Sequence, residues 1–160
     1  MELHNTKIDI SKSKREKLIE MLNQSLADAA DLKSQAKQAH WNVKGPDFIA
    51  LHELFDRVAS EIDGYVDDIA ERITALGGVA MGTVRLAAKN SSLNEYPHEI
   101  SDGAAHIDAL STVLADFGKK VRKNIDASDE IGDKVTADLY TEISREVDKI
   151  LWLVEAHNQS

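Results

Sequence analysis

The chain has 160 residues, no cysteine, two prolines and eight glycines, and aromatic residues make up only 5% of it. Without thiols it can form neither a disulfide nor a thiolate metal site, so imidazole and carboxylate groups are the ligands left for a metal. So few turn-forming residues, with 42% hydrophobic residues, favour long helices over an all-β fold. The length fits one domain with its own core.

The chain contains no apolar run long enough to span a membrane. A signal-peptide pattern is also missing, because the first 17 residues, "MELHNTKIDISKSKREK", are polar throughout. These absences predict a cytoplasmic protein with no membrane partner. The net charge is −9, yet the first 17 residues hold five basic and three acidic side chains. The rest of the chain is therefore strongly acidic, which attracts cations and repels nucleic acid. Only the amino terminus could contact DNA.

Helical spacing of apolar residues divides the rest of the chain into four long segments. The first runs from about residue 12 to 41, and the loop "NVKGPD" separates it from the second, residues 48–76, which ends at Gly77 and Gly78. Residues 77–97 form a long connection with a short helical turn near 83–88. A third helix follows Pro97, and the acidic loop "DASDEIGD" leads to a fourth helix. The apolar stripe of the fourth helix includes Val135, and we expect this stripe and Trp152 to lie in the core.

Four helices with one long crossover between the second and third predict an all-α, ferritin-like four-helix bundle whose crossover contains a short helix. We assign residues 1–11 to a short polar tail and residues 12–160 to the bundle domain. His4, His106 and His157 are expected on the surface.

The second helix carries acidic residues away from its apolar stripe. At 100° per residue, one sector holds His52, Asp56, Asp63, Asp67 and Glu71. A solvated face is the ordinary explanation, but such faces usually mix charges for i,i+4 pairing. Basic partners are nearly absent from this sector, and the small residues Ala59, Ser60 and Ala70 lie among the acids. The pattern favours an interface.

Two pairs in this sector have i,i+4 spacing: His52 with Asp56, and Asp67 with Glu71. Asp56 and Asp67 are about 16 Å apart along the axis, whereas metal ligands must lie within about 2.3 Å of the ion. One chain therefore offers two half-sites. A second copy of this helix, antiparallel across a two-fold axis near Glu61, would complete both.

Two residues at the end of the first helix extend this hypothesis. His40 lies close to the start of the second helix and could be a further ligand, although a lone histidine at a helix end is more often a cap or surface residue. Trp41 is either a core residue or an oxidisable side chain beside the metal.

Several stretches together resemble the Dps family, the mini-ferritins named for DNA-binding proteins from starved cells. The resemblance covers nearly the whole chain from about residue 17, on "KQAHWNVKGPDFIALHELFD", "DGYVDDIAERITALGG", "GVAMGT", "VRKNID", "GDKVTADL" and "SREVDKILWLVEAH". It implies a hollow dodecamer that oxidises Fe(II), preferably with hydrogen peroxide rather than dioxygen, and stores ferric mineral. It also implies a di-iron site at the two-fold interface, with His40, His52 and Asp56 from one subunit and Asp67 and Glu71 from the other.

Five ligands are few for two irons, so the second ion is expected to be weakly held, and Zn, Mn or Co could substitute for Fe. Trp41 matches the tryptophan beside the family's centre. The resemblance also places acidic residues at an iron-entry pore, for which Asp133 and Asp138 match best and Asp129 and Glu130 are further candidates. Negative charge at the start of the fourth helix would explain the same residues without a pore.

Two alternatives remain at this point. A non-enzymatic DNA-compacting or structural assembly of the same fold would use the acidic face only for association, and would place the protein on the nucleoid if it binds DNA. The amino terminus is short and mixed in charge for that role. A conventional ferritin would carry inward-facing ligands with a Glu-x-x-His motif on a helix. The only such spacing, Glu95 and His98, is interrupted by Pro97.

Overall fold

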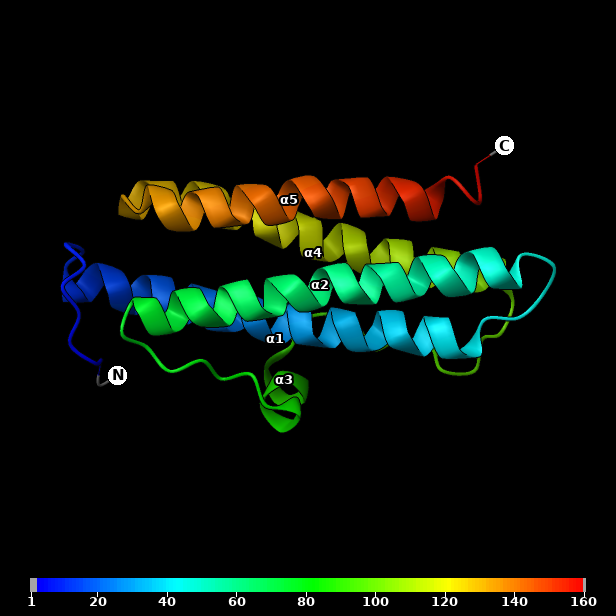
Figure 1. Ribbon diagram of the computed structural model, residues 1–160, viewed down its shortest axis with the longest axis horizontal. Helices are drawn as coiled ribbons and strands as arrows, with labels where there is room; N and C mark the ends of the chain where they lie inside the picture. Colours follow the sequence, from blue (N-terminus) through cyan, green and yellow to red (C-terminus); the bar gives the residue numbers. More distant parts are fainter. Residues whose placement is uncertain (1–2, 160) are drawn as a thin grey trace.

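The computed structural model describes residues 3–159 and contains five helices in the order α1 (Lys12–Asn42), α2 (Phe48–Ala75), α3 (Val84–Asn90), α4 (Gly103–Ile131) and α5 (Lys134–Glu155) (Figure 1). α1 packs along α2 and α4 along α5, and the two pairs meet where α1 contacts α4 and α2 contacts α5. α3 lies outside the bundle against α1 (Figure 1). Residues 3–159 contain no strand. The predicted all-α four-helix bundle with a helical crossover is confirmed.

The apolar stripes of the four long helices form the core. The largest fully buried side chains include Phe55, Phe117 and Tyr140. Val135 and Trp152, expected in the core, are instead 62% and 60% exposed. Both lie on α5 outside its buried row, which includes Tyr140, Ile143, Val147 and Ile150. Within residues 3–159, every helix is too polar or too short to cross a lipid bilayer.

The prediction of an acidic loop at residues 126–133 is wrong, because α4 continues to Ile131. Aspartate and glutamate do not break a helix, whereas Gly132 does: its φ is +91°, a conformation that glycine adopts most easily. The amides of Gly132 and Asp133 both bond to the Ser128 carbonyl, at 3.1 and 3.0 Å. Only Gly132 and Asp133 therefore separate α4 from α5.

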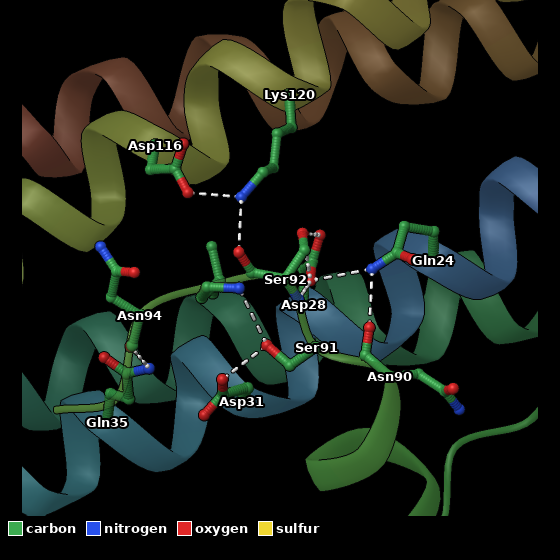
Figure 2. A network of polar contacts seen from close by, with 11 residues as sticks. Gln24, Asp28, Asp31, Gln35, Asn90, Ser91, Ser92, Asn94, Asp116 and Lys120 are labelled. Atoms are coloured by element: carbon green, nitrogen blue, oxygen red, sulfur yellow. Dashed lines mark hydrogen bonds and ion pairs between the residues drawn. The ribbon is translucent and has the colours of Figure 1, made fainter.

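The crossover after α3 is held against the bundle by a polar network (Figure 2). Asp28 on α1 is 2% exposed and accepts hydrogen bonds from the Ser92 amide (2.7 Å) and the Gln24 side chain (3.1 Å). The Ser92 hydroxyl also donates to Asp28, and the Ser92 carbonyl accepts from Lys120 on α4 at 3.2 Å. The crossover thus joins α1 to α4.

Replacing Asp28 with alanine is expected to lower the free energy of unfolding by about 3 kcal/mol, because several hydrogen bonds to one buried carboxylate are lost together. Asp31→Ala is the matched control: Asp31 is half-buried and accepts one hydrogen bond, 2.6 Å from Ser91, so about 1 kcal/mol is expected. Urea unfolding at equal protein concentration measures both values. Equal losses would show that Asp28 does not anchor the crossover.

Candidate metal centre

The corner between α1 and α2 brings His40 and His52 together. The connection between these helices is short, from Val43 to Asp47, and Gly45 turns it with a φ of +115°. The two imidazole rings stack with centroids 3.8 Å apart and planes inclined by 22°. Both side chains are half-buried at the edge of the bundle. Two histidines 12 residues apart in sequence therefore act as one pair.

Reciprocal hydrogen bonds fix how these two rings are protonated. His40 Nδ1 lies 2.7 Å from the His52 carbonyl oxygen, and His52 Nδ1 lies 2.8 Å from the His40 carbonyl oxygen. A carbonyl only accepts hydrogen bonds, so each Nδ1 must donate. In a neutral ring the lone pair is then on Nε2. Backbone carbonyls orient metal-binding histidines in this way, so both Nε2 atoms are prepared to bind a cation.

Asp56 lies one turn beyond His52 on α2, with its carboxylate 56% exposed. Lys37 on α1 donates a hydrogen bond to it at 2.6 Å, and this bond holds the pKa of Asp56 below its usual value. The ammonium group of Lys37 also lies 5.6 Å from the Trp41 ring centroid. A metal ion at Asp56 would compete with Lys37.

The expectation that basic partners are nearly absent from this face was wrong. Lys37 pairs with Asp56, and Lys33 pairs with Asp63 at 2.6 Å. Both lysines belong to α1, so the periodicity of α2 could not reveal them. Ala59 was also misplaced, because it is 3% exposed and faces the core.

Asp67 and Glu71 lie further along α2, and both side chains are exposed. Asp67 and Glu71 do not complete a site with His40, His52 and Asp56, and these three do not converge on one point themselves. Within residues 3–159, no three histidine, aspartate or glutamate side chains lie close enough to hold a metal. One chain therefore presents two separate groups of candidate ligands, which we call partial sets: His52 with Asp56, and Asp67 with Glu71. Trp41, beside His40, is 65% exposed, which excludes the core explanation for it in a single chain.

The acidic residues near the α4–α5 connection do not share one environment. Asp133 is 3% exposed, caps α5 by accepting from the Val135 amide at 3.1 Å, and pairs with Arg72 of α2 at 2.7 Å. Burial acts to raise the pKa of Asp133, but hydrogen bonds from Thr136 and Arg72 outweigh it and leave the pKa lowered. Asp129, Glu130 and Asp138 are exposed. Asp126 is exposed as well, and Asp129 is paired with Lys134.

A buried Tyr96 and His106 pair was missed. His106 was expected on the surface but is 1% exposed, and its Nδ1 lies 2.7 Å from the Tyr96 hydroxyl. A signal did exist: His106 precedes Leu110 by four residues, and Leu110 is followed at the same spacing by the buried Leu114. His106 is therefore a member of this buried stripe, although its side chain is polar.

Comparison with known proteins matches this architecture. The family described as "Ferritin-like domain" matches residues 19–160. The DNA protection during starvation protein of Agrobacterium fabrum is 45% identical over 99% of this chain and 98% of its own length. DpsA14 from Streptomyces coelicolor has a TM-score of 0.94 at 34% identity, covering 100% of this chain and 96% of that one.

A third relative concerns iron directly. The Dps from Microbacterium arborescens, solved in a high iron form, has a TM-score of 0.85 at 33% identity and covers 92% of this chain and 95% of its own. Both identity and coverage are high across all three comparisons. This chain belongs to the ferritin-like proteins and, within them, to the Dps family of DNA protection during starvation proteins.

Proposed function

We propose that this protein oxidises Fe(II), preferably with hydrogen peroxide, at sites shared between two subunits, and stores the ferric product inside a dodecamer in the cytoplasm. The observation that carries the proposal is the histidine pair, whose carbonyl contacts leave both Nε2 atoms free at the corner of α1 and α2, one helical turn from Asp56. Imidazole and carboxylate together suit Fe(II), and Zn, Mn or Co would compete for the same ligands.

The geometry of α2 supports a shared site. His52 with Asp56, and Asp67 with Glu71, form partial sets on one exposed face of the same straight helix. Each set is too small to hold iron alone, and a two-fold axis near Glu61 would bring one set beside the other set of a second copy. The exposed Trp41, Phe48 and Ile49 at the adjacent corner are apolar surface that a subunit contact would cover.

The chemistry follows from the ligands. Carboxylates stabilise Fe(III) more than Fe(II), so binding at Asp56, Asp67 and Glu71 favours loss of an electron. Two Fe(II) ions and one hydrogen peroxide give two Fe(III) and two hydroxide ions, with no hydroxyl radical released. In the free protein Lys37 neutralises Asp56, and iron would displace it. Removing Fe(II) and peroxide together is what would protect a cell and its DNA.

Iron would enter through a pore lined by acidic side chains near the α4–α5 connection. Asp129, Glu130 and Asp138 are exposed there, and exposed carboxylates attract cations. Asp133 would support the pore by capping α5, since its carboxylate is bound to Arg72 and Thr136.

The alternative, a DNA-compacting assembly, is less well supported. The amide of His4 bonds to the Gly77 carbonyl at 2.8 Å, and Arg15 bonds to the carbonyls of Ile10 and Leu76. The amino-terminal segment is thereby attached to the end of α2, and one of its five basic side chains is used in that attachment. A segment bound in this way is a poor DNA-binding arm.

The proposal is tested by following Fe(II) oxidation under peroxide. Asp67→Ala combined with Glu71→Ala is expected to lose most of the rate, because it removes one partial ligand set from every subunit. The matched control is Glu20→Ala with Glu99→Ala, which removes two exposed carboxylates elsewhere. Equal rates for the wild type and the Asp67 and Glu71 variant would overturn the ferroxidase proposal and favour the structural assembly.

A further inference from the structure

Tyr96 and His106 form a buried phenol and imidazole pair behind the corner that carries His40. Tyr96 is 8% exposed and lies in the crossover, and His106 is 1% exposed in the first turn of α4. Their hydrogen bond is 2.7 Å long, and the rings are nearly parallel at 19°. The corner is joined to this region, because the Lys44 amide bonds to the Ser101 carbonyl at 2.8 Å.

The phenol is the donor in this hydrogen bond. Burial raises the pKa of Tyr96 and lowers the pKa of His106, so the neutral forms of both groups are favoured. If Nδ1 donated instead, the phenol proton would be buried without an acceptor. With Nδ1 accepting, the proton of His106 is on Nε2, which forms no hydrogen bond within residues 3–159.

Three groups around His106 reduce the cost that burial imposes on a positive ring. The carbonyl groups of Ile100 and Asn42 and the carboxylate of Asp102 all act to raise its pKa against the effect of burial. They come from three elements: the end of α1, the crossover and the cap of α4. The site thus has a proton donor, an acceptor and a setting for the resulting imidazolium.

We propose that Tyr96 is an oxidisable residue of this protein, which gives up one electron while its phenol proton moves to Nδ1 of His106. The inference rests on the proposed iron oxidation, which supplies the oxidant. A single Fe(II) that reduces hydrogen peroxide yields Fe(III), hydroxide and a hydroxyl radical. The electron from Tyr96 converts that radical, or a side chain it has oxidised, to its reduced form.

A second Fe(II) returns Tyr96 and His106 to their neutral starting forms. Tyr96 becomes a neutral tyrosyl radical beside the His106 imidazolium. A second Fe(II) then returns one electron, the proton goes back to the phenol oxygen, and a second Fe(III) is formed. The sum is two Fe(II) oxidised per peroxide with two hydroxide ions formed, the same as when two irons react together. A centre that holds only one iron tightly would therefore still avoid releasing radicals.

Tyr96 differs from the other two tyrosines because its hydroxyl is hydrogen-bonded to a base, the His106 imidazole, that can take its proton. The Tyr140 hydroxyl bonds to Ser25 at 2.9 Å, and an alcohol is too weak a base to take its proton. Tyr65 is half-buried, and no hydrogen bond of its hydroxyl is found within residues 3–159. The Phe55 ring of α2 lies against the pair, with its centroid 6.3 Å from that of His106.

Electron paramagnetic resonance tests the inference directly. Protein loaded with Fe(II) without oxygen is mixed with hydrogen peroxide and frozen at successive times, while Fe(III) formation is followed in parallel. A tyrosyl signal is expected in the wild type and in the matched controls Tyr65→Phe and Tyr140→Phe, and its loss is expected in Tyr96→Phe. In His106→Gln, which keeps a polar group but removes the base, the signal is expected to be weaker and shorter-lived.

Two further measurements separate this inference from the proposed function. Exchange into deuterium oxide should reveal, in wild-type protein, one exchangeable proton hydrogen-bonded to the radical oxygen. A photoexcited ruthenium complex with persulfate oxidises the protein without iron. A radical dependent on Tyr96 under light, with no iron oxidation, would support the pair and overturn the ferroxidase. Iron oxidation with no such radical under either oxidant would overturn the pair alone.

Discussion

Two inactive variants are expected to restore activity to each other when they assemble together. His52→Ala removes a ligand from the first partial set, and Asp67→Ala with Glu71→Ala removes the second set. In a mixed pair of subunits, one shared site combines both defects, and the other combines the two intact sets. Random mixing should recover about one quarter of the wild-type sites.

The experiment requires co-expression with two different affinity tags and sequential purification, so that every particle contains both chains. Fe(II) oxidation under peroxide is then compared with each variant alone, at equal subunit concentration. The matched control is a mixture of His52→Ala with Asp56→Ala, which damages the same partial set in both chains and should stay inactive. No recovery in the first mixture would show that each site lies within one subunit.

Replacing Arg72 with methionine is expected to lower the free energy of unfolding by about 3 to 5 kcal/mol. The Arg72 and Asp133 side chains are 14% and 3% exposed and lie 2.7 Å apart, joining α2 to the start of α5. Without Arg72 the carboxylate is left buried and unpaired. Arg122→Met is the control: its pair with Asp148 is about half exposed, so a loss of at most about 1 kcal/mol is expected.

The pH dependence of this loss has a definite sign. The pKa of Asp133 is lowered in the folded protein, so its contribution to stability is present above the ordinary aspartate pKa. It is lost as the pH falls from that value through the folded one. The difference between wild type and Arg72→Met should therefore be largest near neutral pH and shrink in acid. Adding Asp133→Asn should recover part of the loss, and no recovery would exclude the unpaired charge as its cause.

Much of the fold could be predicted from the sequence because periodicity reports what each helix buries. The stripe of Leu51, Phe55, Ile62 and Ile69 predicted α2, and these residues are at most 1% exposed. The end of α4 was missed because charge does not stop a helix. Gly132 ends it through backbone conformation, which a count of acidic residues does not describe.

The positions of His52 beside Asp56, and of Asp67 beside Glu71, were also predictable, because the i,i+4 spacing of a helix fixes which side chains lie one turn apart on the same face. The contacts that these side chains make with residues of other elements were not predictable. Lys37 reaches Asp56 from α1, and His106 turns inward to Tyr96 of the crossover. No spacing within α2 or α4 encodes those contacts.

The sequence by itself determined the long helices and the acidic face of α2, because local geometry constrains them directly, and the absence of cysteine excluded a thiolate site. Only the tertiary structure decided that His40 and His52 each donate Nδ1–H to the other's carbonyl. It also decided that Asp133 is bound to Arg72 and that the Tyr96 hydroxyl meets the His106 imidazole. Each of these depends on where the chain returns in space, since hydrogen bonds require atoms to approach within about 3 Å.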